Sequence, residues 1–365
     1  MEIHLKRAEF LAELGPMQGV VERRTTIPVL SHILLEAADD RLSLAATDLD
    51  VSLTSWCDAE ITSPGGVAVQ AKKFIEIIRS LVDDEVHLEL EDEKRLVIVS
   101  GRSRFKINGL SPEDFPTLPE VSDEGAQEVP FQQLKGMIAK VLFAVSTEES
   151  RFQLNGALFK IKDEGIELVA TDGHRLALVE NALAGGRAQD GVLVPRKALQ
   201  ELQRFEGDGS LSLRRSEHHL SFRLGRRELI CRILEGTFPD YERVIAKDND
   251  KNLAFDRQEL AAAVQRVALL TGDRTRAVRL RFDDGCLDIS AANPDLGEAV
   301  EEVPCDYAGE GFSLGINPDY LANFLSAVGT ERVQFELKDE NSQCIGLPID
   351  GDDQRYLCVI MPMRV

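Results

Sequence analysis

Two groups of residues in this sequence have types and spacings that could support catalysis. Residues 311–315 read GFSLG, which matches the G-x-S-x-G pattern of a nucleophilic serine. Asp172 and His174 alternate along one expected strand, so their side chains could share acid–base work. A hydrolase built on this serine pattern needs a histidine after the serine, yet the last histidine in the sequence is His219. We therefore keep a hydrolase as the rival hypothesis and expect no catalytic residue.

Cysteine spacing bears on metal and disulfide chemistry. None of the six cysteines forms a C-x-x-C pair, and none has a histidine at the spacing of a zinc site. A disulfide framework is equally unsupported. The sequence thus predicts no metal ion and no cofactor, and it predicts reduced, mostly buried thiols at positions 57, 231, 286, 305, 344 and 358.

An internal repeat positions Asp172 and His174. Residues 166–180 read IELVATDGHRLALVE, and similar stretches occur as LSLAATDLDVSL at 42–53 and LDISAANPDLGEAV at 287–300. Each is an alternating apolar run, a polar turn and a second alternating run, which predicts a β-hairpin with one buried face. Asp48, Asp172 and Asn293 are 124 and 121 positions apart. The other two copies have no histidine, which argues against a repeated catalytic pair and suits a peptide pocket.

Each hairpin is flanked by strands that run directly into helices, and this order also recurs three times. Apolar periodicity predicts amphipathic helices at 6–24, 72–81, 131–145, 196–204, 257–269 and 318–328. Charged stretches with Phe-Pro pairs at 111–128 and 235–251 separate the repeats. We therefore expect an α+β fold of three repeated domains, 1–120, 128–244 and 245–365. Each should contain antiparallel sheets of about eight strands, with two helices gathered on one side.

The net charge of −21, taken alone, argues against nucleic-acid binding. The charge is unevenly distributed, because the six expected helices together carry +7 and the rest of the chain −28. Since one face of each helix is expected to pack on a sheet, the other faces would form a mildly basic layer on an acidic protein. The sequence has no apolar run of about 18 residues and no secretory pattern, so we expect a cytoplasmic protein.

Seven short motifs, spread in order over the whole chain, resemble those of one family. They are TDLD (47–50), SGRSRF (100–105), ATDGHRLA (170–177), VPRK (194–197), FPDYERVI (238–245), NPD (293–295) and the terminal MPMRV. Together they resemble the bacterial DNA polymerase III beta subunit, the replicative sliding clamp. The resemblance implies a homodimeric ring around duplex DNA, with helices lining the hole and sheets outside.

In that family the ring is a processivity factor that binds DNA without sequence preference. Its partners, as the resemblance implies, are the DNA polymerase III alpha subunit, the clamp loader, and other polymerases and repair proteins that bind through short linear motifs. No membrane is involved. A repeat-built interaction scaffold that never meets DNA remains a second alternative, because it would share the peptide pocket but would show no dependence on DNA ends.

The resemblance assigns DNA contact by position to Arg24, Lys72, Glu148, Arg151, Phe152, Gln153, Arg196 and Lys197. The loop EESRFQ departs from the family, because Glu148 and Glu149 stand where less acidic residues are usual and Phe152 is its single aromatic residue. Arg151 is therefore expected to supply part of the contact. A weak hold suits sliding, since each neutralised phosphate adds affinity and salt dependence.

The resemblance also implies a pocket for partner peptides and a seam between subunits. The pocket corresponds to Leu154, Thr171, Gly173, His174, Arg175, Leu176, Pro239, Arg243, Val244, Val359, Met361, Pro362, Met363 and Arg364. The seam joins a basic edge strand of one subunit to an acidic edge of the other. It corresponds to Lys73, Arg102, Arg104, Phe105, Ile107, Leu269, Leu270, Glu298, Glu301 and Glu302.

Overall fold

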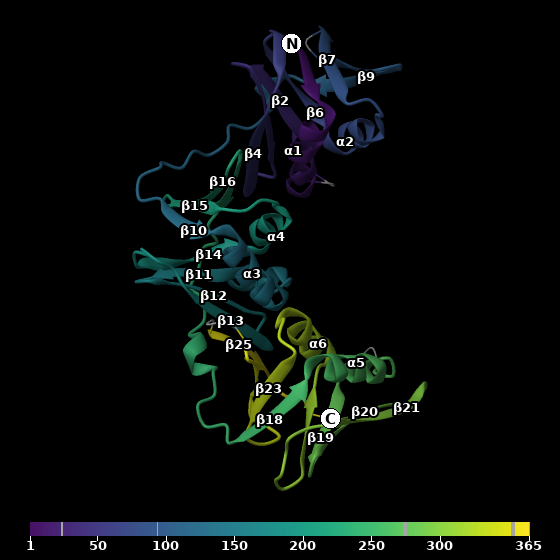
Figure 1. Cartoon of the computed structure of the whole chain (residues 1–365), viewed down its shortest axis with the longest axis vertical. Coiled ribbons are helices and arrows are strands. Elements are labelled where there is room, and N and C mark those ends of the chain that lie inside the picture. The colour runs from purple at the N-terminus through teal and green to yellow at the C-terminus, as the bar shows by residue number, and fades with distance from the viewer. Residues whose placement is uncertain (23–24, 93, 273–275, 352–354, 365) are drawn as a thin grey trace. The chain divides into compact units, whose positions relative to one another are not determined.

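The computed structural model describes residues 1–22, 25–92, 94–272, 276–351 and 355–364 (Figure 1). The six expected helices are confirmed, as α1 (Arg7–Val20), α2 (Ala71–Ser80), α3 (Phe131–Val141), α4 (Arg196–Arg204), α5 (Arg257–Ala268) and α6 (Pro318–Ala327). Short 3-10 turns are η1 (Pro28–Ser31), η2 (Pro112–Asp114), η3 (Leu142–Ala144), η4 (Glu149–Leu154) and η5 (Tyr241–Arg243).

Helix α1 ends earlier than expected and contains a proline. It stops at Val20 because Val21 takes an extended conformation, with φ −60° and ψ 142°. Pro16 lies inside the helix and has no N–H to donate, which frees the carbonyl oxygen of Ala12. Arg227 Nη2 donates to that oxygen at 3.1 Å. A side chain more than two hundred positions away thus replaces the missing helical hydrogen bond.

The strands confirm the three expected hairpins, which are β3–β4, β12–β13 and β20–β21. Strands of the first repeat are β1 (Glu2–Lys6), β2 (His32–Ala38), β3 (Arg41–Thr47), β4 (Val51–Asp58), β5 (Glu60–Ser63), β6 (Gly65–Gln70), β7 (Glu85–Asp92), β8 (Arg95–Ser100) and β9 (Ser103–Leu110). Those of the second are β10 (Gln127–Pro130), β11 (Gly156–Lys162), β12 (Gly165–Thr171), β13 (Arg175–Ala182), β14 (Gln189–Pro195), β15 (Ser210–Arg215), β16 (His219–Leu224) and β17 (Arg227–Arg232). Those of the third are β18 (Lys251–Asp256), β19 (Val278–Asp283), β20 (Cys286–Asn293), β21 (Gly297–Pro304), β22 (Phe312–Ile316), β23 (Arg332–Leu337), β24 (Cys344–Ile349) and β25 (Arg355–Ile360).

Within the described ranges the strands pair antiparallel in three sheets, two of which join neighbouring repeats. One runs β10-β15-β16-β17-β4-β3-β2-β6-β9-β8-β7-β1-β5, a second runs β14-β11-β12-β13-β25-β24-β23-β18, and the third is β21-β20-β19-β22. The joining pairs are β17 with β4, which sets Cys231 opposite Val51, and β13 with β25, which sets Leu176 opposite Val359. Each pairing covers backbone groups that an edge strand would leave exposed.

The chain folds as two compact units. The first contains residues 1–135 and 197–233, and the second contains residues 136–196 and 234–365. The central repeat contributes to both units, because its strand β17 continues the sheet of the first repeat and its strand β13 continues the sheet of the third.

Helix pairs bury the apolar stripes that the sequence indicated. In the first unit α1 packs on α2 and on strands β3 and β4, and the rings of Phe10 and Phe74 meet edge to face with centroids 5.8 Å apart. In the second unit α5 packs on α6, where Phe324 meets Phe335 of β23 at 5.8 Å. All four phenylalanines are buried. Among the described residues, none of the helices combines the length and apolar character that crossing a membrane would require.

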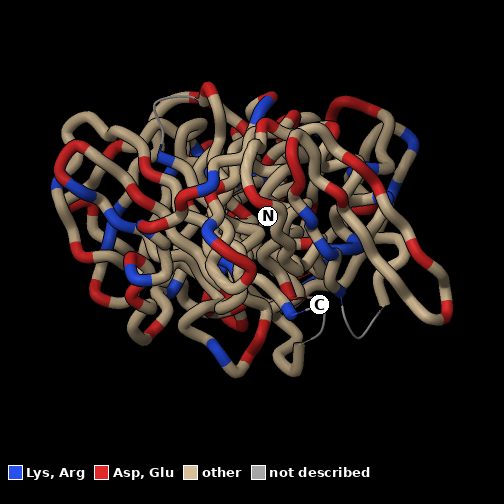
Figure 2. The backbone as a smooth tube through the Cα atoms, turned by 90° about the horizontal axis from the view of Figure 1, so that it is seen from below, with Lys and Arg blue, Asp and Glu red and all other residues tan. Residues whose placement is uncertain are grey.

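The cations expected on the solvent faces of the helices divide into two groups. Four are exposed, namely Lys72, Lys73, Arg79 and Arg204, and four are partly buried, namely Lys135, Lys140, Arg196 and Lys197. The second group is used internally; Lys135 Nζ, for example, donates to the carbonyl oxygen of Phe205 at 2.7 Å. Asp and Glu positions are spread along the whole backbone, with Lys and Arg among them (Figure 2). The basic layer therefore has fewer exposed cations than the number of Lys and Arg residues in the helices suggested.

Candidate functional site

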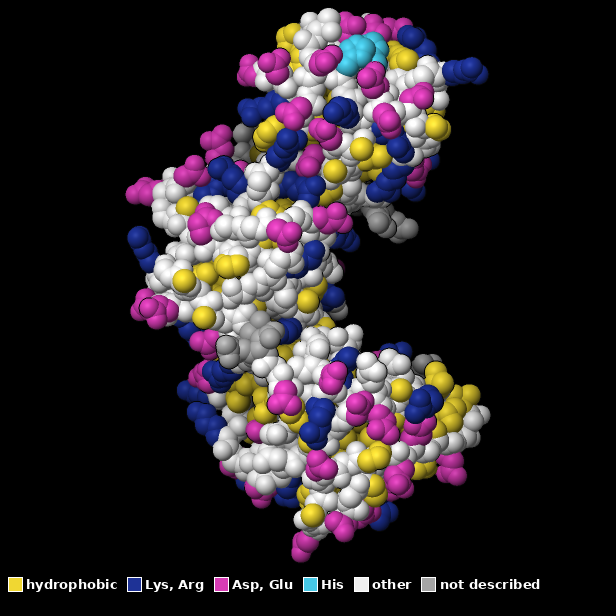
Figure 3. Space-filling model, viewed as in Figure 1, with side chains coloured by type: hydrophobic (Ala, Val, Ile, Leu, Met, Phe, Trp, Pro, Cys, Tyr) yellow, Lys and Arg dark blue, Asp and Glu magenta, His cyan; other side chains and the backbone are white. Residues whose placement is uncertain are grey.

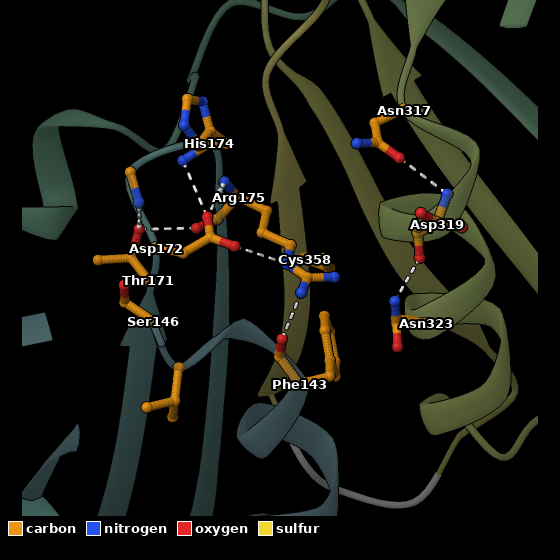
Figure 4. Close-up of polar contacts among 12 residues, drawn as sticks. Phe143, Ser146, Thr171, Asp172, His174, Arg175, Asn317, Asp319, Asn323 and Cys358 are labelled. Atoms are coloured by element: carbon orange, nitrogen blue, oxygen red, sulfur yellow. Dashed lines mark hydrogen bonds and ion pairs between the residues drawn. The ribbon is translucent and has the colours of Figure 1, made fainter. Parts of the chain in front are cut away.

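The turn between β12 and β13 is built by side-chain hydrogen bonds to the backbone (Figure 4). Thr171 Oγ1 accepts from the amide of Gly173 at 3.1 Å and donates to the carbonyl oxygen of Arg175 at 2.6 Å. Asp172 Oδ1 accepts from the amides of His174 and Arg175 at 2.9 and 3.0 Å. Gly173 has φ +89°, a left-handed conformation that favours glycine. The turn therefore holds His174 exposed on a fixed backbone.

The same turn recurs in the first repeat, as the sequence predicted. Thr47 Oγ1 accepts from the amide of Leu49 at 3.0 Å, and Asp48 Oδ1 accepts from the amide of Asp50 at 3.0 Å. Leu49 takes φ +81°, close to the value of Gly173. The Asp172 carboxylate is thus a turn-forming group, which accounts for the recurrence of aspartate without histidine.

Arg175 anchors this turn to its surroundings in the second unit (Figure 4). Its Nε donates to Asp172 Oδ2 at 3.0 Å, and its Nη2 donates to the carbonyl oxygen of Phe143 in η3 at 2.5 Å. The guanidinium lies 4.4 Å from the ring centre of Tyr320 in α6, which is cation–π range. Only 12% of the Arg175 side chain is exposed. Arg175 therefore positions the turn and is poorly placed to bind a ligand as an open cation.

The C-terminal segment lies beside the turn. β13 pairs with β25 so that Arg175 faces Ile360, and the amide of Met361 donates to the carbonyl oxygen of His174 at 2.9 Å. The amide of Met363 then donates to the carbonyl oxygen of Gly315 in β22 at 2.8 Å. The structure thus brings the predicted His174, Met361 and Met363 together, although they lie far apart in the sequence.

An apolar cluster continues the site along β13 and β25. Leu176 and Val359 are buried in it, and Val244 is partly exposed at its edge. Its other members were missed by sequence reasoning, and they are Leu158, Val169, Leu178, Leu193, Leu234, Phe238, Tyr241, Ile245, Ala246, Ile345, Leu347 and Leu357. The FPDYERVI motif (238–245) carried a local signal for Phe238, Tyr241 and Ile245, because it concentrates apolar residues in a short segment outside the strands. Of the other predicted pocket residues, Pro239 and Arg243 are exposed beside this cluster and Leu154 is buried. Pro362 is half-buried, and Arg364 is exposed.

A buried ion pair fixes the segment that carries Tyr241. Glu167 is 1% exposed, and its carboxylate accepts from Tyr241 Oη at 2.6 Å and from Lys162 Nζ at 2.7 Å. Burial raises the pKa of Glu167, but the hydrogen bonds from Lys162 and Tyr241 outweigh it, so the pKa lies below its ordinary value. Tyr241 and η5 are thereby held against β12.

Tyr241→Phe is expected to destabilise the second unit most at neutral pH. A carboxyl whose pKa is lowered by folding contributes stability above its unfolded pKa, and this stability is lost as the pH falls through the folded pKa. Removing the hydroxyl should cost about 1–3 kcal/mol near pH 7, and less at an acid pH below the lowered pKa of Glu167, where the carboxyl is protonated. Urea unfolding at both pH values measures the difference. Tyr307→Phe is the matched control, because Tyr307 donates to a backbone carbonyl and its cost should not vary with pH.

The predicted DNA-contacting loop lies against the same turn. Phe152 in η4 is 56% exposed, which is unusual for a large aromatic side chain and suits a contact surface. Arg151 Nη1 donates to the carbonyl oxygen of Asp172 at 3.3 Å, and Arg151 Nε lies 3.5 Å from a Glu148 carboxylate oxygen. A Cβ atom at Gly173 would lie 2.8 Å from Arg151 Nη1. That nitrogen ends a flexible side chain and can move, so the positive φ, more than lack of space, favours glycine at this position.

The other predicted DNA-contacting cations differ in how they are used. Lys72 is exposed in the first turn of α2, where the helix dipole disfavours a cation, so helix stability does not explain its presence. Arg196 Nη1 donates to the carbonyl oxygen of Val145 at 2.9 Å, and Lys197 Nζ donates to that of Val20 at 2.6 Å. Lys197 also pairs with Asp48. Arg24 lies outside the described residues.

Two sheet edges carry the residues predicted for the subunit seam. In the first unit, residues 103–108 of β9 pair with β8, and only the last two residues of β9 reach β6, which leaves an open edge among the described residues. Arg102 and Arg104 are exposed there, with Phe105 and Ile107 half-buried. Lys73 is exposed and lies 2.7 Å from a carboxylate oxygen of Glu76.

In the second unit, β21 is the outer strand of its sheet. Glu298 and Glu302 are exposed on it, whereas Glu301 already forms a bidentate ion pair with Arg266 of α5. Leu269, just after α5, is 78% exposed, and Leu270 is half-buried. One open edge is thus basic and the other acidic.

The serine motif lacks the placement that catalysis requires. Ser313 lies inside β22, directly opposite Arg281 of β19, whereas the nucleophilic serine of this motif sits on the turn between strand and helix. The geometry removes the main support for a hydrolase.

Known proteins match this chain over its full length. Sequence profiles of the DNA polymerase III beta subunit match residues 1–119 (N-terminal domain), 128–240 (central domain) and 242–364 (C-terminal domain). The beta sliding clamps of Caulobacter vibrioides and Pseudomonas aeruginosa are 40% and 37% identical, each over 100% of both chains. The crystal structure of the sliding clamp of Bartonella birtlesii bound to griselimycin has a TM-score of 0.94 at 35% identity, and that of the P. aeruginosa beta subunit has 0.93 at 37%, again over 100% of both chains. With three matching domains and this identity throughout, the chain belongs to the family of bacterial DNA polymerase III beta subunits, the sliding clamps.

Proposed function

We propose that two copies of this sliding clamp join head to tail into a ring, which encircles duplex DNA and tethers the replicative polymerase to it. The observation that carries this proposal is the pair of open, oppositely charged sheet edges. β9 of one copy, with Arg104 on the strand and Arg102 in the turn before it, and β21 of the other, with Glu298 and Glu302, can continue one sheet across the boundary. A contact between two different surfaces closes into a ring when its rotation allows, here with two copies.

Contact with DNA is proposed for a small group of described residues. Lys72 and Phe152 are exposed, and Arg151 and Gln153 lie in the same loop as Phe152. Glu148 beside Arg151 weakens the local positive potential. Arg196 and Lys197 donate hydrogen bonds to backbone carbonyl oxygens of the same chain. Few cations are therefore left to neutralise phosphates, which favours a weak and mobile hold. The protein then stays on DNA because it encloses the duplex, and it does not need to recognise any base.

The apolar cluster at β13 and β25 is proposed as the socket for partner proteins. Val244 at its edge and the adjoining Met361 and Met363 offer apolar contacts next to the exposed His174. Methionine adapts its shape to different apolar side chains, so one groove can accept short motifs from several proteins. A sliding clamp of Caulobacter crescentus is described with polyethylene glycol at a putative beta-motif tethering region. The polymerase alpha subunit, the clamp loader and repair proteins are the proposed occupants.

In this proposal the protein has no catalytic activity and works in the cytoplasm, where bacterial chromosomes are copied. The position of Ser313 inside a strand and the use of Asp172 in a turn support the first point. A hydrolase screen with Ser313→Ala as the control tests this point, and activity that the variant loses would contradict it.

Clamps loaded on a circular plasmid are expected to dissociate quickly once the plasmid is cut. Free ends let an enclosing ring slide off, whereas a protein held by ionic contacts would stay bound. The measurement is gel filtration of labelled protein with DNA before and after cleavage by a restriction enzyme. Linear DNA with bulky proteins fixed at both ends is the control and should retain the clamp. Equal retention on DNA with free ends and on DNA with blocked ends would contradict enclosure. A protein that never associates with the plasmid would favour the alternative of an interaction scaffold that does not bind DNA.

A further inference from the structure

Strands β1 and β7 carry a cluster of histidine and glutamate side chains that the clamp function does not use. The two strands pair antiparallel, with His4 directly opposite His87 and Glu2 directly opposite Glu89. Side chains two residues apart share one face of a strand, so Glu2 and His4 lie on the face away from the buried Ile3. Figure 3 shows histidine side chains together at the surface of the first unit, bordered by acidic ones.

The distances within this cluster suit a metal ion. One ligand atom from each of Glu2, His4 and His87 lies within 4.8 Å of the others. His87 Nε2 is 3.4 Å from Glu2 Oε1. A tetrahedral zinc ion with bonds of about 2.1 Å holds neighbouring ligand atoms about 3.4 Å apart, so this pair already has the required spacing. The rings of His4 and His87 are stacked at 4.3 Å, and His4 is exposed, so it can rotate its ring toward a shared ion.

A second observation points to a ligand. His87 Nε2 is sealed from solvent and has no hydrogen-bond partner among the described residues, because its geometry toward Glu2 does not make a hydrogen bond. A buried polar atom without a partner is costly and rare in folded proteins. Coordination of a cation by the nitrogen lone pair would satisfy this atom.

We propose that Glu2, His4 and His87 bind one divalent cation of the zinc type. Two imidazoles and a carboxylate are a ligand set that zinc accepts, whereas magnesium and calcium prefer oxygen ligands alone. The remaining coordination position would be open to water or to Glu89, which lies opposite Glu2. Because β1 is hydrogen-bonded between β5 and β7, the ion would pin the first strand of the chain to its sheet.

The test titrates ZnCl₂ into the full-length protein, made without an affinity tag and stripped of metals with EDTA. Calorimetry should show one ion bound per chain, and the melting temperature should rise by a few degrees. His4→Ala, at an exposed position, and His87→Gln should each weaken zinc binding by at least about 100-fold. Visible absorption of bound Co²⁺ gives an independent readout of nitrogen and oxygen ligands, and both variants should lose it.

Matched controls come from elsewhere in the chain. Cys286, Asp288 and Glu302 form another group whose ligand atoms lie within 4.8 Å, so Cys286→Ser tests the competing site. His218→Ala removes an exposed histidine outside the cluster. Both controls should bind zinc like the parent protein. Unchanged binding in the His4 and His87 variants, or loss of binding in Cys286→Ser, would overturn the assignment.

Discussion

Replacing Leu269 and Leu270 together by alanine is expected to convert the protein from dimer to monomer at micromolar concentration. Leu269 is 78% exposed in the single chain, and Leu270 is half-buried beside it. Across the proposed seam both would pack against Phe105 and Ile107 of the other copy. The change removes about three carbon atoms per residue at about 0.8 kcal/mol each, or about 5 kcal/mol at each of the two seams of the ring. The dimer dissociation constant should therefore rise by about 1000-fold or more.

Sedimentation velocity over a concentration series measures this shift. Leu49→Ala is the matched control, since Leu49 is also an exposed leucine, at 55%, and lies outside the proposed seam. An unchanged dimer in the double variant would show that the seam is elsewhere. Charge reversal adds a sharper test, because Arg102→Glu with Arg104→Glu should weaken the dimer, and adding Glu298→Arg with Glu302→Arg should restore part of it.

Deleting residues 361–365 is expected to abolish binding of a peptide from the polymerase tail. The deletion removes Met361 and Met363, whose backbone amides hold the segment to His174 and Gly315. Burying each methionine against a ligand is worth about 1.5–3 kcal/mol, so the affinity should fall by more than about 100-fold. Fluorescence anisotropy of a labelled peptide is the measurement.

The deletion begins directly after β25, so the sheet that carries the apolar cluster should remain intact. Circular dichroism and the melting temperature verify this. Met363→Ser is a milder variant that keeps the backbone anchors and should weaken binding by an intermediate amount. Lys247→Ala, exposed a few residues beyond η5, is the control and should bind the peptide normally. If the truncated protein keeps its affinity, partner peptides bind outside this cluster.

Local periodicity explains why so much of the fold could be predicted. Alternation over 42–53, 166–180 and 287–300 determines which face of each strand is apolar, and the 3.6-residue stripe in α2 or α6 determines which face of the helix is buried. Both patterns act between residues a few positions apart, so they are readable without a structure. The end of α1 was mispredicted because the extended backbone of Val21 ends the helix while the periodic pattern continues.

Long-range pairings explain what could not be predicted. Nothing in the spacing of the residues shows that Lys197 reaches Asp48, or that Arg175 stacks on Tyr320 and so cannot act as an open cation. His4 and His87 are 83 positions apart, and only the pairing of β1 with β7 makes them neighbours. A search for metal-binding spacing along the chain could not find them.

Residue order and local pattern are enough to predict the three repeats, the helices and hairpins within them, and the family. The folded chain is needed to show which sheet edges are shared and which stay open, which cations bond within the chain, and which distant side chains meet. Those outcomes depend on the register between strands that are remote in the chain, and strand pairing at such distances follows from the packing of the whole molecule.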